Sequence, residues 1–290
     1  MSDRAITGRT NLCGVIGDPI EHTMSPAIHN AAFAQMGLDY VYVPFHVKQE
    51  ELGKAIDGMR ALNIRGFNVT IPHKVAVIPL LDKLDPLAEK IGAVNTVTND
   101  DGVLEGSNTD AGGFLQALLE KGIEPKGENI VILGAGGASR AVSFSLVESG
   151  AHLFILHRRL EKAEELADRL SASFNKEVKA LELVVDNLAQ VLDRADILVN
   201  ATNVGISPNI NETLVPSSLL KPGLVVVDII YNPIKTRLLW EAEAVGARIV
   251  NGVDMFVWQG ALAFEIWTGV KAPVELMRAE VVRQLKGHEK

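Results

Sequence analysis

Cysteine and basic residues are scarce in this sequence, and each shortage argues against a class of protein. Its 290 residues include a single cysteine, Cys13, so no disulfide can form within the chain. Cys13 lies in the apolar stretch 12–16, where a packed thiol is more typical than a nucleophile. The 36 acidic side chains outnumber the 28 lysines and arginines, which gives a formal net charge of −8. This balance argues against partners such as nucleic acid or a membrane surface.

Long apolar runs and metal-ligand spacings are missing as well. No run is long enough to cross a bilayer and no secretory signal pattern opens the sequence, so we expect a soluble, cytoplasmic protein. The seven histidines show no His-Glu-x-x-His spacing, so we expect no bound metal. Apolar side chains, in contrast, make up 47% of the residues. That share is enough for the cores of about two domains of ~150 residues each.

Predicted strands and helices alternate along the chain, which is typical of a mainly parallel α/β sheet covered on both faces. The predicted strands span residues 12–16, 40–47, 66–69, 94–98, 103–107, 129–133, 152–156, 197–200, 224–228 and 248–250. The predicted helices span residues 25–36, 50–62, 86–90, 110–120, 159–170 and 254–268, with one more after residues 134–139.

A charged, turn-rich segment at residues 121–128 separates two halves of the sequence. We therefore predict a two-domain α/β protein with one domain at residues 1–112 and a Rossmann-like domain at residues 113–253. The tail is apolar and helical at residues 254–268 and follows the second sheet. We expect this helix to pack back on the first domain, which residues 254–290 complete.

Residues 68–74 (Asn-Val-Thr-Ile-Pro-His-Lys) follow a short apolar strand. Proline is favoured in a first helical turn, so this stretch predicts a helix with Pro72 in that turn and Thr70 as its cap. Lys74 would then lie near the helix N-terminus, where the helix dipole disfavours a cation. A lysine at an unfavourable position is a candidate for chemistry, and the alternative is a solvated surface lysine.

Four polar clusters lie at strand-to-helix junctions of the predicted first domain, and the carboxyl ends of strands are where ligands bind in parallel sheets. The clusters are Thr23 with Ser25, Asn68 with Thr70 and Lys74, Asn95 with Thr96, and Asn108 with Thr109 and Asp110. Taken singly, Ser25, Thr70 or Asp110 is as readily a helix cap, and Asn95 as readily holds a turn. Together they suit a small polyhydroxylated acid, with a lysine and a carboxylate beside the reacting oxygen.

Residues 134–139 (Gly-Ala-Gly-Gly-Ala-Ser) join an apolar strand to a helix, the arrangement that binds a dinucleotide pyrophosphate. The fingerprint is imperfect because Ser139 occupies the third glycine position. About 20 residues further on, where NAD sites place an acidic residue, the chain has His157-Arg158-Arg159. Arg158 suits the 2′-phosphate of NADP, and the alternative is a basic helix start exposed to water.

Seven segments carry a resemblance that covers essentially the whole chain. They are residues 14–26 followed by His29-Asn30, and residues 68–74, 92–96, 108–110, 134–139, 231–233 and 252–269. In order and spacing they resemble the signatures of the NADP-dependent shikimate dehydrogenase family. The resemblance implies an oxidoreductase that uses NADPH to reduce 3-dehydroshikimate reversibly to shikimate, in chorismate and aromatic amino acid biosynthesis.

The same resemblance implies roles for particular residues. Lys74 and Asp110 would be the catalytic pair. Substrate would contact Thr23, Ser25, Asn68, Thr70, Asn95, Tyr231 and Gln259. NADP would contact Gly134, Ala135, Gly136, Gly137, Ala138, His157, Arg158, Lys162, Ile229 and Gly252. The chain departs from the family pattern at Thr23, usually serine, and at 157–159, usually Asn-Arg-Thr.

Two alternative functions are weighed against this one. The first, which the departures at Thr23 and 157–159 leave open, is a quinate/shikimate dehydrogenase with relaxed use of substrate or cofactor. The other is a non-catalytic NADP-binding sensor, which should lack the lysine–aspartate pair or carry a basic segment for nucleic acid. A methylene-tetrahydrofolate dehydrogenase should bring a Tyr-x-x-x-Lys pair in the first domain, which this sequence lacks. The implied partner is the small-molecule substrate, and the chain would act as a monomer or a homodimer.

Overall fold

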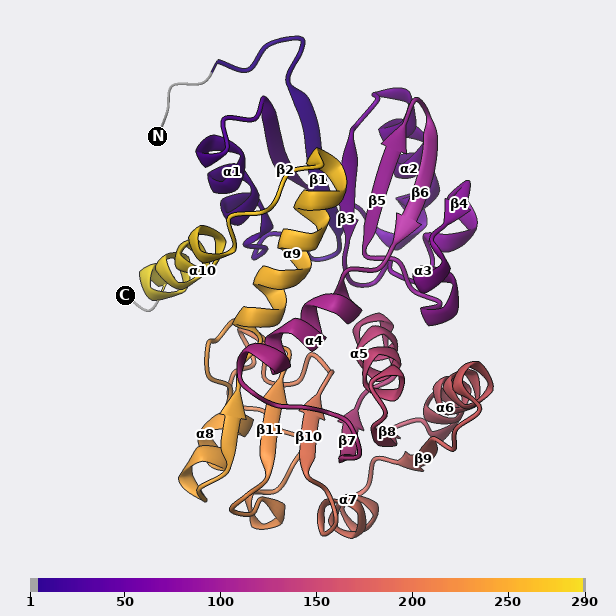
Figure 1. The fold of residues 1–290 in the computed structure, drawn as a ribbon, viewed down its shortest axis with the longest axis vertical. Helices are drawn as coiled ribbons and strands as arrows, with labels where there is room; N and C mark the ends of the chain where they lie inside the picture. The colour runs from indigo at the N-terminus through magenta and orange to yellow at the C-terminus, as the bar shows by residue number, and fades with distance from the viewer. Residues whose placement is uncertain (1–4, 289–290) are drawn as a thin grey trace. The chain divides into compact units, whose positions relative to one another are not determined.

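The structure, a computed structural model, describes residues 5–288. The chain divides into two compact units (Figure 1). The first unit contains the residues up to Gly113 together with those from Val257 onward, and the second unit is Phe114–Phe256. No helix in the described part of the chain is long and apolar enough to cross a membrane.

A six-stranded sheet forms the centre of the first unit, in the order β2-β1-β3-β5-β6-β4. Its strands are β1 (Asn11–Gly17), β2 (Tyr40–His46), β3 (Gly66–Val69), β4 (Lys83–Leu84), β5 (Thr96–Asp100) and β6 (Val103–Ser107). β1 is parallel to both β2 and β3, whereas β5 is antiparallel to β3 and β6. The sheet is therefore mixed, and its parallel part brings the ends of β1, β2 and β3 to one edge.

Helices cover both faces of this sheet (Figure 1). They are α1 (Ser25–Gln35), α2 (Leu52–Ala61), α3 (Pro86–Ile91), most of α9 (Val253–Thr268) and α10 (Val274–His288). α2 buries Leu52, Ile56 and Met59 in one core, and α1 packs against β2 and α10.

The C-terminal helix α9 packs on the first sheet, as the sequence predicts. The indole Nε1 of Trp267 donates a hydrogen bond of 3.1 Å to the carbonyl of Val97 in β5. Gly66 in β3 has no space for a Cβ because the Trp267 ring lies against it. A buried tryptophan with a satisfied N–H and a matching glycine fixes this helix on the sheet.

The helix expected around Lys74 is absent, so this prediction was wrong. Residues 70–77 form turns that lead into a short 3₁₀ helix, η2 (Ile78–Leu80). His73 Nε2 donates to the Val47 carbonyl at 2.6 Å, and the Lys74 carbonyl accepts from Val94 N at 2.8 Å. Because these groups bond to other segments instead of to a helical ladder, the helix-dipole argument for Lys74 does not apply.

The second unit is built on six parallel strands in the order β12-β11-β10-β7-β8-β9. These are β7 (Asn129–Leu133), β8 (His152–His157), β9 (Lys179–Glu182), β10 (Ile197–Asn200), β11 (Val225–Asp228) and β12 (Arg248–Val250). The strand order reverses direction beside β7, and this switch point is where Rossmann-like sheets bind ligands. The predicted Rossmann-like domain is confirmed.

The helices of the second unit are α5 (Gly137–Glu148), α6 (Leu160–Phe174), α7 (Val185–Leu192), α8 (Arg237–Ala244) and most of α4 (Asp110–Glu120), together with the short 3₁₀ helix η3 (Ser217–Leu219). α5 and α6 pack on β7, β8 and β9, while α8 packs on β11 and β12. Leu188 of α7 and Leu238 of α8 join one core with Val131 and Leu198 of the sheet.

Candidate active site

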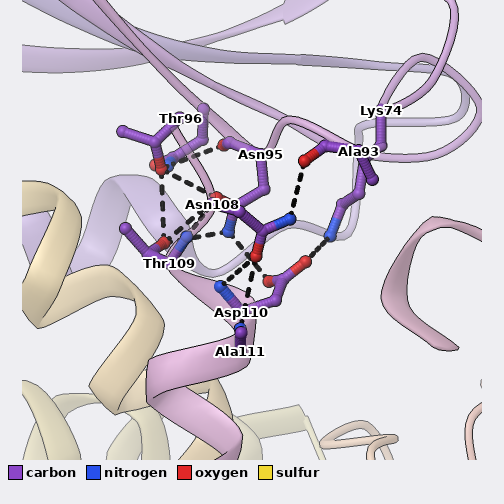
Figure 2. Close-up of polar contacts among 9 residues, drawn as sticks. Lys74, Ala93, Asn95, Thr96, Asn108, Thr109, Asp110 and Ala111 are labelled. Carbon is purple, nitrogen blue, oxygen red and sulfur yellow. Dashed lines mark hydrogen bonds and ion pairs between the residues drawn. The ribbon is translucent and has the colours of Figure 1, made fainter. Parts of the chain in front are cut away.

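Lys74 and Asp110 form a buried ion pair in the first unit (Figure 2). Lys74 comes from the turn after β3, and Asp110 is the first residue of α4. The distance from Nζ to Oδ2 is 2.5 Å, and the side chains are only 14% and 5% exposed. A short, charge-assisted hydrogen bond fixes the position of the ammonium group.

The amide of Asn95 holds the other oxygen of Asp110. Asn95 Nδ2 donates to Asp110 Oδ1 at 2.8 Å and to Thr109 Oγ1 at 2.9 Å. Asn95 Oδ1 accepts from the backbone N–H of Thr109 at 2.7 Å. Because a backbone N–H can only donate, this bond decides which end of the amide faces Asp110. Both carboxylate oxygens therefore have a fixed donor.

Asn108, and not Asp110, caps helix α4. Its Oδ1 accepts from the backbone N–H groups of Asp110 at 3.1 Å and Ala111 at 3.3 Å. Its Nδ2 donates to the Ala93 carbonyl at 2.9 Å. The cap leaves the Asp110 carboxylate available for Lys74, so the alternative role of Asp110 as a helix cap is not what the structure contains.

Asn68 and Thr96 extend this cluster across two neighbouring strands, where they form a register pair. Asn68 Nδ2 donates to the Asn95 carbonyl at 3.2 Å and to Thr96 Oγ1 at 3.1 Å. Thr96 Oγ1 lies 3.0 Å from Asn95 Oδ1. The structure thus joins three of the four predicted clusters in one hydrogen-bonded set. Its members, named here the Lys74 cluster, are Asn68, Lys74, Asn95, Thr96, Asn108, Thr109 and Asp110.

Thr23 and Ser25 form a separate pair of hydroxyls. Thr23 Oγ1 lies 3.3 Å from Ser25 Oγ and also accepts from the Ser25 backbone N–H at 3.3 Å. Ser25 is the first residue of α1 and Met24 occupies the cap position, so the alternative role of Ser25 as the helix cap is off by one residue. Within residues 5–288, neither hydroxyl bonds directly to the Lys74 cluster.

The structure also describes the surroundings of three further predicted substrate residues. Thr70 donates its backbone N–H to the Ile16 carbonyl at 3.0 Å, and no hydrogen bond of its hydroxyl joins the Lys74 cluster in the described part of the chain. Gln259 lies on α9, where its backbone passes so close to Gly113 that a Cβ at Gly113 would be 2.7 Å from Gln259 N. Tyr231 belongs to the second unit and stacks on Phe256 at 4.2 Å.

The glycine-rich turn of the second unit has a backbone that suits a pyrophosphate. Gly134 has a φ of +112°, and a Cβ there would be 2.9 Å from the Ala201 carbonyl oxygen. Gly136 precedes α5 with an extended backbone, and a Cβ there would meet nothing within 4 Å. Ser139 Oγ donates to the Gly134 carbonyl at 2.6 Å, so the serine ties the turn to the helix. The helix start carries no side-chain cap, so its N–H groups suit an anion.

Basic side chains surround the end of β8. Arg158 is exposed, and Arg159 N donates to His157 Nδ1 at 3.1 Å. Glu165 bridges Lys162 at 2.8 Å and Arg140 at 2.6 Å. Hydrogen bonds from Lys162 first and Arg140 second lower the pKa of Glu165 to about 2. Lys162 therefore already has a carboxylate partner, which its spacing of three residues from Glu165 on α6 could have suggested.

The carboxyl ends of β11 and β12 hold Ile229 and Gly252 close together. Gly252 N donates to the Ile230 carbonyl at 3.1 Å, and a Cβ at Gly252 would overlap the Ile229 carbonyl. Only glycine therefore fits at position 252 without a shift of the backbone.

The sequence interpretation missed Asp228, a fully buried carboxylate next to these residues. It accepts from Asn200 Nδ2 at 3.1 Å, Ile230 N at 3.0 Å and Thr236 Oγ1 at 2.7 Å. Burial raises the pKa of Asp228 to about 6, against the effect of its three donors. The available signal was an acidic residue within the otherwise apolar run 224–230.

The described residues 5–288 contain no candidate set of metal ligands. No group of three or more histidine, cysteine, aspartate or glutamate side chains converges there. The candidate chemistry of this part of the chain is therefore that of hydroxyls, amides, the Lys74–Asp110 ion pair and a glycine-rich turn that suits an anion.

Three family models match consecutive parts of the chain. The shikimate dehydrogenase substrate binding domain matches residues 15–97, and the shikimate/quinate 5-dehydrogenase model matches residues 117–234. The shikimate 5′-dehydrogenase C-terminal domain matches residues 252–282. The matches account for both units and for the C-terminal helices.

Individual relatives are similar over nearly the whole length of the chain. The NADP⁺ shikimate dehydrogenase of Methanopyrus kandleri is 50% identical over 285 residues, which cover 97% of this chain and 98% of that protein. A crystal structure of a shikimate dehydrogenase in complex with NADP⁺ superposes with a TM-score of 0.91 at 47% identity and covers 97% and 98% of the two chains. The Thermus thermophilus enzyme in complex with NADP(H) and shikimate gives a TM-score of 0.84 at 37% identity and covers 94% and 99%.

Proposed function

The chain belongs to the shikimate dehydrogenase family, and on that premise we propose that it catalyses the reversible, NADPH-dependent reduction of 3-dehydroshikimate to shikimate. One observation carries the proposal from the family to this chain. Lys74 and Asp110 are paired at 2.5 Å, and Asn95 holds the second carboxylate oxygen. A chain that only sensed NADP would have no need of this arrangement.

Lys74 is the proposed proton donor. The bound reduced nicotinamide supplies the hydride. As the substrate carbonyl is reduced, negative charge develops on its oxygen, and an ammonium group beside that oxygen stabilises the charge and delivers the proton. An ammonium group has three N–H donors, so the bond to Asp110 leaves two for the substrate. Asp110 and Asn95 orient the lysine and do not have to change protonation.

Hydroxyls and amides of the first unit are the proposed substrate ligands. Thr23 and Ser25 would donate to the substrate carboxylate, and Asn68, Thr70, Gln259 and, from the second unit, Tyr231 would contact ring hydroxyls. Both amide hydrogens of Asn95 already have protein acceptors. A direct contact between Asn95 Nδ2 and substrate therefore requires the substrate to replace either Thr109 or Asp110 as an acceptor.

NADP is the proposed cofactor, and the turn and the end of β8 fit it. Gly134, Ala135, Gly136, Gly137 and Ala138 would hold the pyrophosphate through their backbone, because an open Gly136 and an uncapped α5 offer donors without obstruction. His157, Arg158 and Lys162 would surround the adenosine 2′-phosphate, and Ile229 and Gly252 would line the nicotinamide. Lys162 would then share its charge between Glu165 and the phosphate.

Each predicted domain has its own role in the proposed reaction. Residues 1–112 with 254–290 would bind substrate and carry the catalytic pair, and residues 113–253 would bind NADP. The same proposal includes a cytoplasmic location and a monomer or homodimer. Light scattering on the purified chain measures the mass in solution, and an assembly larger than a dimer would contradict that part.

Four assays of the purified protein test the proposed reaction. Shikimate and quinate are each offered with NADP and with NAD, and the absorbance of the reduced nicotinamide is followed. Rapid turnover with shikimate and NADP alone is the expected result. Turnover of quinate at a similar kcat/KM would favour the broader quinate/shikimate dehydrogenase, for which Thr23 is the motivating departure. No change of absorbance in any of the four mixtures would contradict both proposed activities.

A further inference from the structure

Asn68 is held from behind by Tyr42, a residue with no proposed role in substrate or cofactor binding. The phenol Oη of Tyr42 donates to Asn68 Oδ1 at 2.7 Å. The two residues are 1% and 6% exposed. We propose that Tyr42 is a positioning residue for the reaction, which acts by fixing the carboxamide of Asn68. This inference rests on the proposed function, in which Asn68 contacts substrate.

The phenol and the Lys74 cluster together specify the whole amide. Asn68 Oδ1 receives the tyrosine hydroxyl, while Nδ2 donates to the Asn95 carbonyl and to Thr96 Oγ1. Both amide hydrogens are then used, so the free lone pair of Oδ1 is what remains for a substrate hydroxyl. Without the phenol, that oxygen would be a buried acceptor with one donor fewer, and the amide would be held only through the bonds of Nδ2.

Tyr42 is itself fixed by two residues of the opening signature that the catalytic roles leave unexplained. β2 is an edge strand, and Asn30 covers its free edge. Asn30 Nδ2 donates to the Tyr42 carbonyl at 2.9 Å, and Tyr42 N donates to Asn30 Oδ1 at 2.8 Å. The ring of His29 stacks on the ring of Tyr42 at 4.4 Å with an angle of 8°. The backbone and the ring of Tyr42 are therefore both immobilised.

His29 acts in this stack as a neutral ring. It is fully buried, and burial lowers the pKa of its imidazole to about 3. Trp267 lies beside the same pair, with its ring centre 6.0 Å from that of Tyr42. The path from the signature to the reaction thus runs from His29 and Asn30 through Tyr42 to Asn68. A purely structural role would make Tyr42 a core tyrosine whose hydroxyl affects stability alone.

Tyr42→Phe separates these two roles because it removes only the hydroxyl. We expect the KM for shikimate to rise about tenfold, which corresponds to the loss of one buried hydrogen bond. We expect kcat to stay within about twofold and the KM for NADP to stay unchanged, because the Lys74–Asp110 pair is intact. Tyr40→Phe is the matched control: Tyr40 is on the same strand, but its hydroxyl donates to the Trp267 carbonyl at 3.3 Å. A wild-type KM for shikimate in Tyr42→Phe would overturn the proposal.

The Asn68→Ala background decides whether Tyr42 acts through Asn68. There, Tyr42→Phe should change the KM for shikimate by less than about twofold, because the group that it positions is gone. The same tenfold factor in both backgrounds would contradict the proposal.

A measurement without substrate keeps this test independent of the proposed function. In protein labelled with ¹⁵N at asparagine, the side-chain NH₂ signals of Asn68 should exchange with water about tenfold faster in Tyr42→Phe than in wild type or Tyr40→Phe. Unchanged exchange would refute the positioning role, even if the wild-type protein turned out not to oxidise shikimate. Faster exchange in a protein that lacks shikimate turnover would leave Tyr42 as the group that holds Asn68 and contradict only the proposed reaction.

Discussion

Two buried carboxylates, one in each unit, are both held by an asparagine amide and yet face different partners. Asp110 has a cation, Lys74, at 2.5 Å and Asn95 at 2.8 Å. Asp228 has only neutral donors among its bonds, from Asn200, Thr236 and a backbone N–H. The first arrangement presents an ammonium group with spare donors, so it can act on a substrate. In the second arrangement, all three donors bond to the Asp228 carboxylate, so its role is to fix the position of the chain.

What Asp228 holds is the segment after β11. Thr236 donates to Asp228 and caps α8 by accepting from Leu239 N at 3.4 Å. The residues between them include Ile229 and Tyr231, two of the proposed ligand contacts. The comparison therefore distinguishes a carboxylate that orients a reacting group from one that fixes a loop, and each can be broken separately.

Removal of Lys74 should have the largest effect. Lys74→Ala leaves the hydroxyls and amides in place but deletes the proton donor, so kcat should fall by a factor on the order of 10² or more. NADP binding, followed by fluorescence titration, should be nearly unchanged. Lys83→Ala, a change at an exposed lysine of the same unit, is the control. A near-normal kcat in Lys74→Ala would contradict the proposed role of Lys74 as the proton donor.

Removal of Asp228 should affect stability first. Asp228→Ala leaves the donors of Asn200, Ile230 and Thr236 without their buried acceptor, which costs on the order of 3 kcal/mol. Urea unfolding, followed by circular dichroism, should show a lower midpoint. Asp228→Asn keeps one oxygen acceptor and should lose less. A wild-type midpoint for the alanine variant would show that this carboxylate does not hold the loop.

The dependence of stability on pH should also distinguish Asp228, which has only neutral partners, from Asp110. Burial raises the pKa of Asp228 from 3.8 to about 6, so the folded state binds this proton more tightly than the unfolded state does. Its contribution to stability is complete below about pH 4 and is lost as the pH rises through about 6. Relative to Asp228→Asn, wild type should therefore lose on the order of 1–3 kcal/mol between pH 4 and 7. A constant difference across that range would show that burial does not disfavour the ionised carboxylate.

Removal of the exposed charge of Arg158 should have the smallest effect, and only on the use of NADP. Arg158→Ala should raise the KM for NADP about tenfold, because one charge-assisted contact to the 2′-phosphate is lost. The KM for NAD should not change, since that cofactor lacks the phosphate. Arg159→Ala removes the same charge one residue away and serves as the control. Equal effects on NADP and NAD would contradict the proposed role of Arg158.

The order of the elements could be predicted from the sequence because strands buried on both faces are apolar runs with turn residues at their ends. Residues 66–69 and 110–120 have the predicted bounds in the structure. The short strands β4 and β9 and the helices α7, α8 and α10 were missed. β4 has only two residues, and β9 is not an apolar run because its charged end residues, Lys179 and Glu182, are exposed. The helix predicted after Thr70 failed because contacts from Val47 and Val94 outweigh the local preference for a turn of helix.

The residue types at the strand ends determined the candidate chemistry: a lysine and an aspartate among hydroxyls and amides, and a glycine-rich turn followed by arginines. The sequence also predicted that these positions would gather at the carboxyl ends of parallel strands. Lys74 follows β3 in this way, whereas Asn95 and Thr96 lie at the start of β5, which is antiparallel to β3. Only the tertiary structure decided that Asn108 takes over the cap and leaves Asp110 to Lys74, that Tyr42 lies behind Asn68, and that Asp228 has neutral partners. The physical reason is that a hydrogen bond depends on direction and on tenths of an ångström, which residues distant in sequence acquire only when the chain packs.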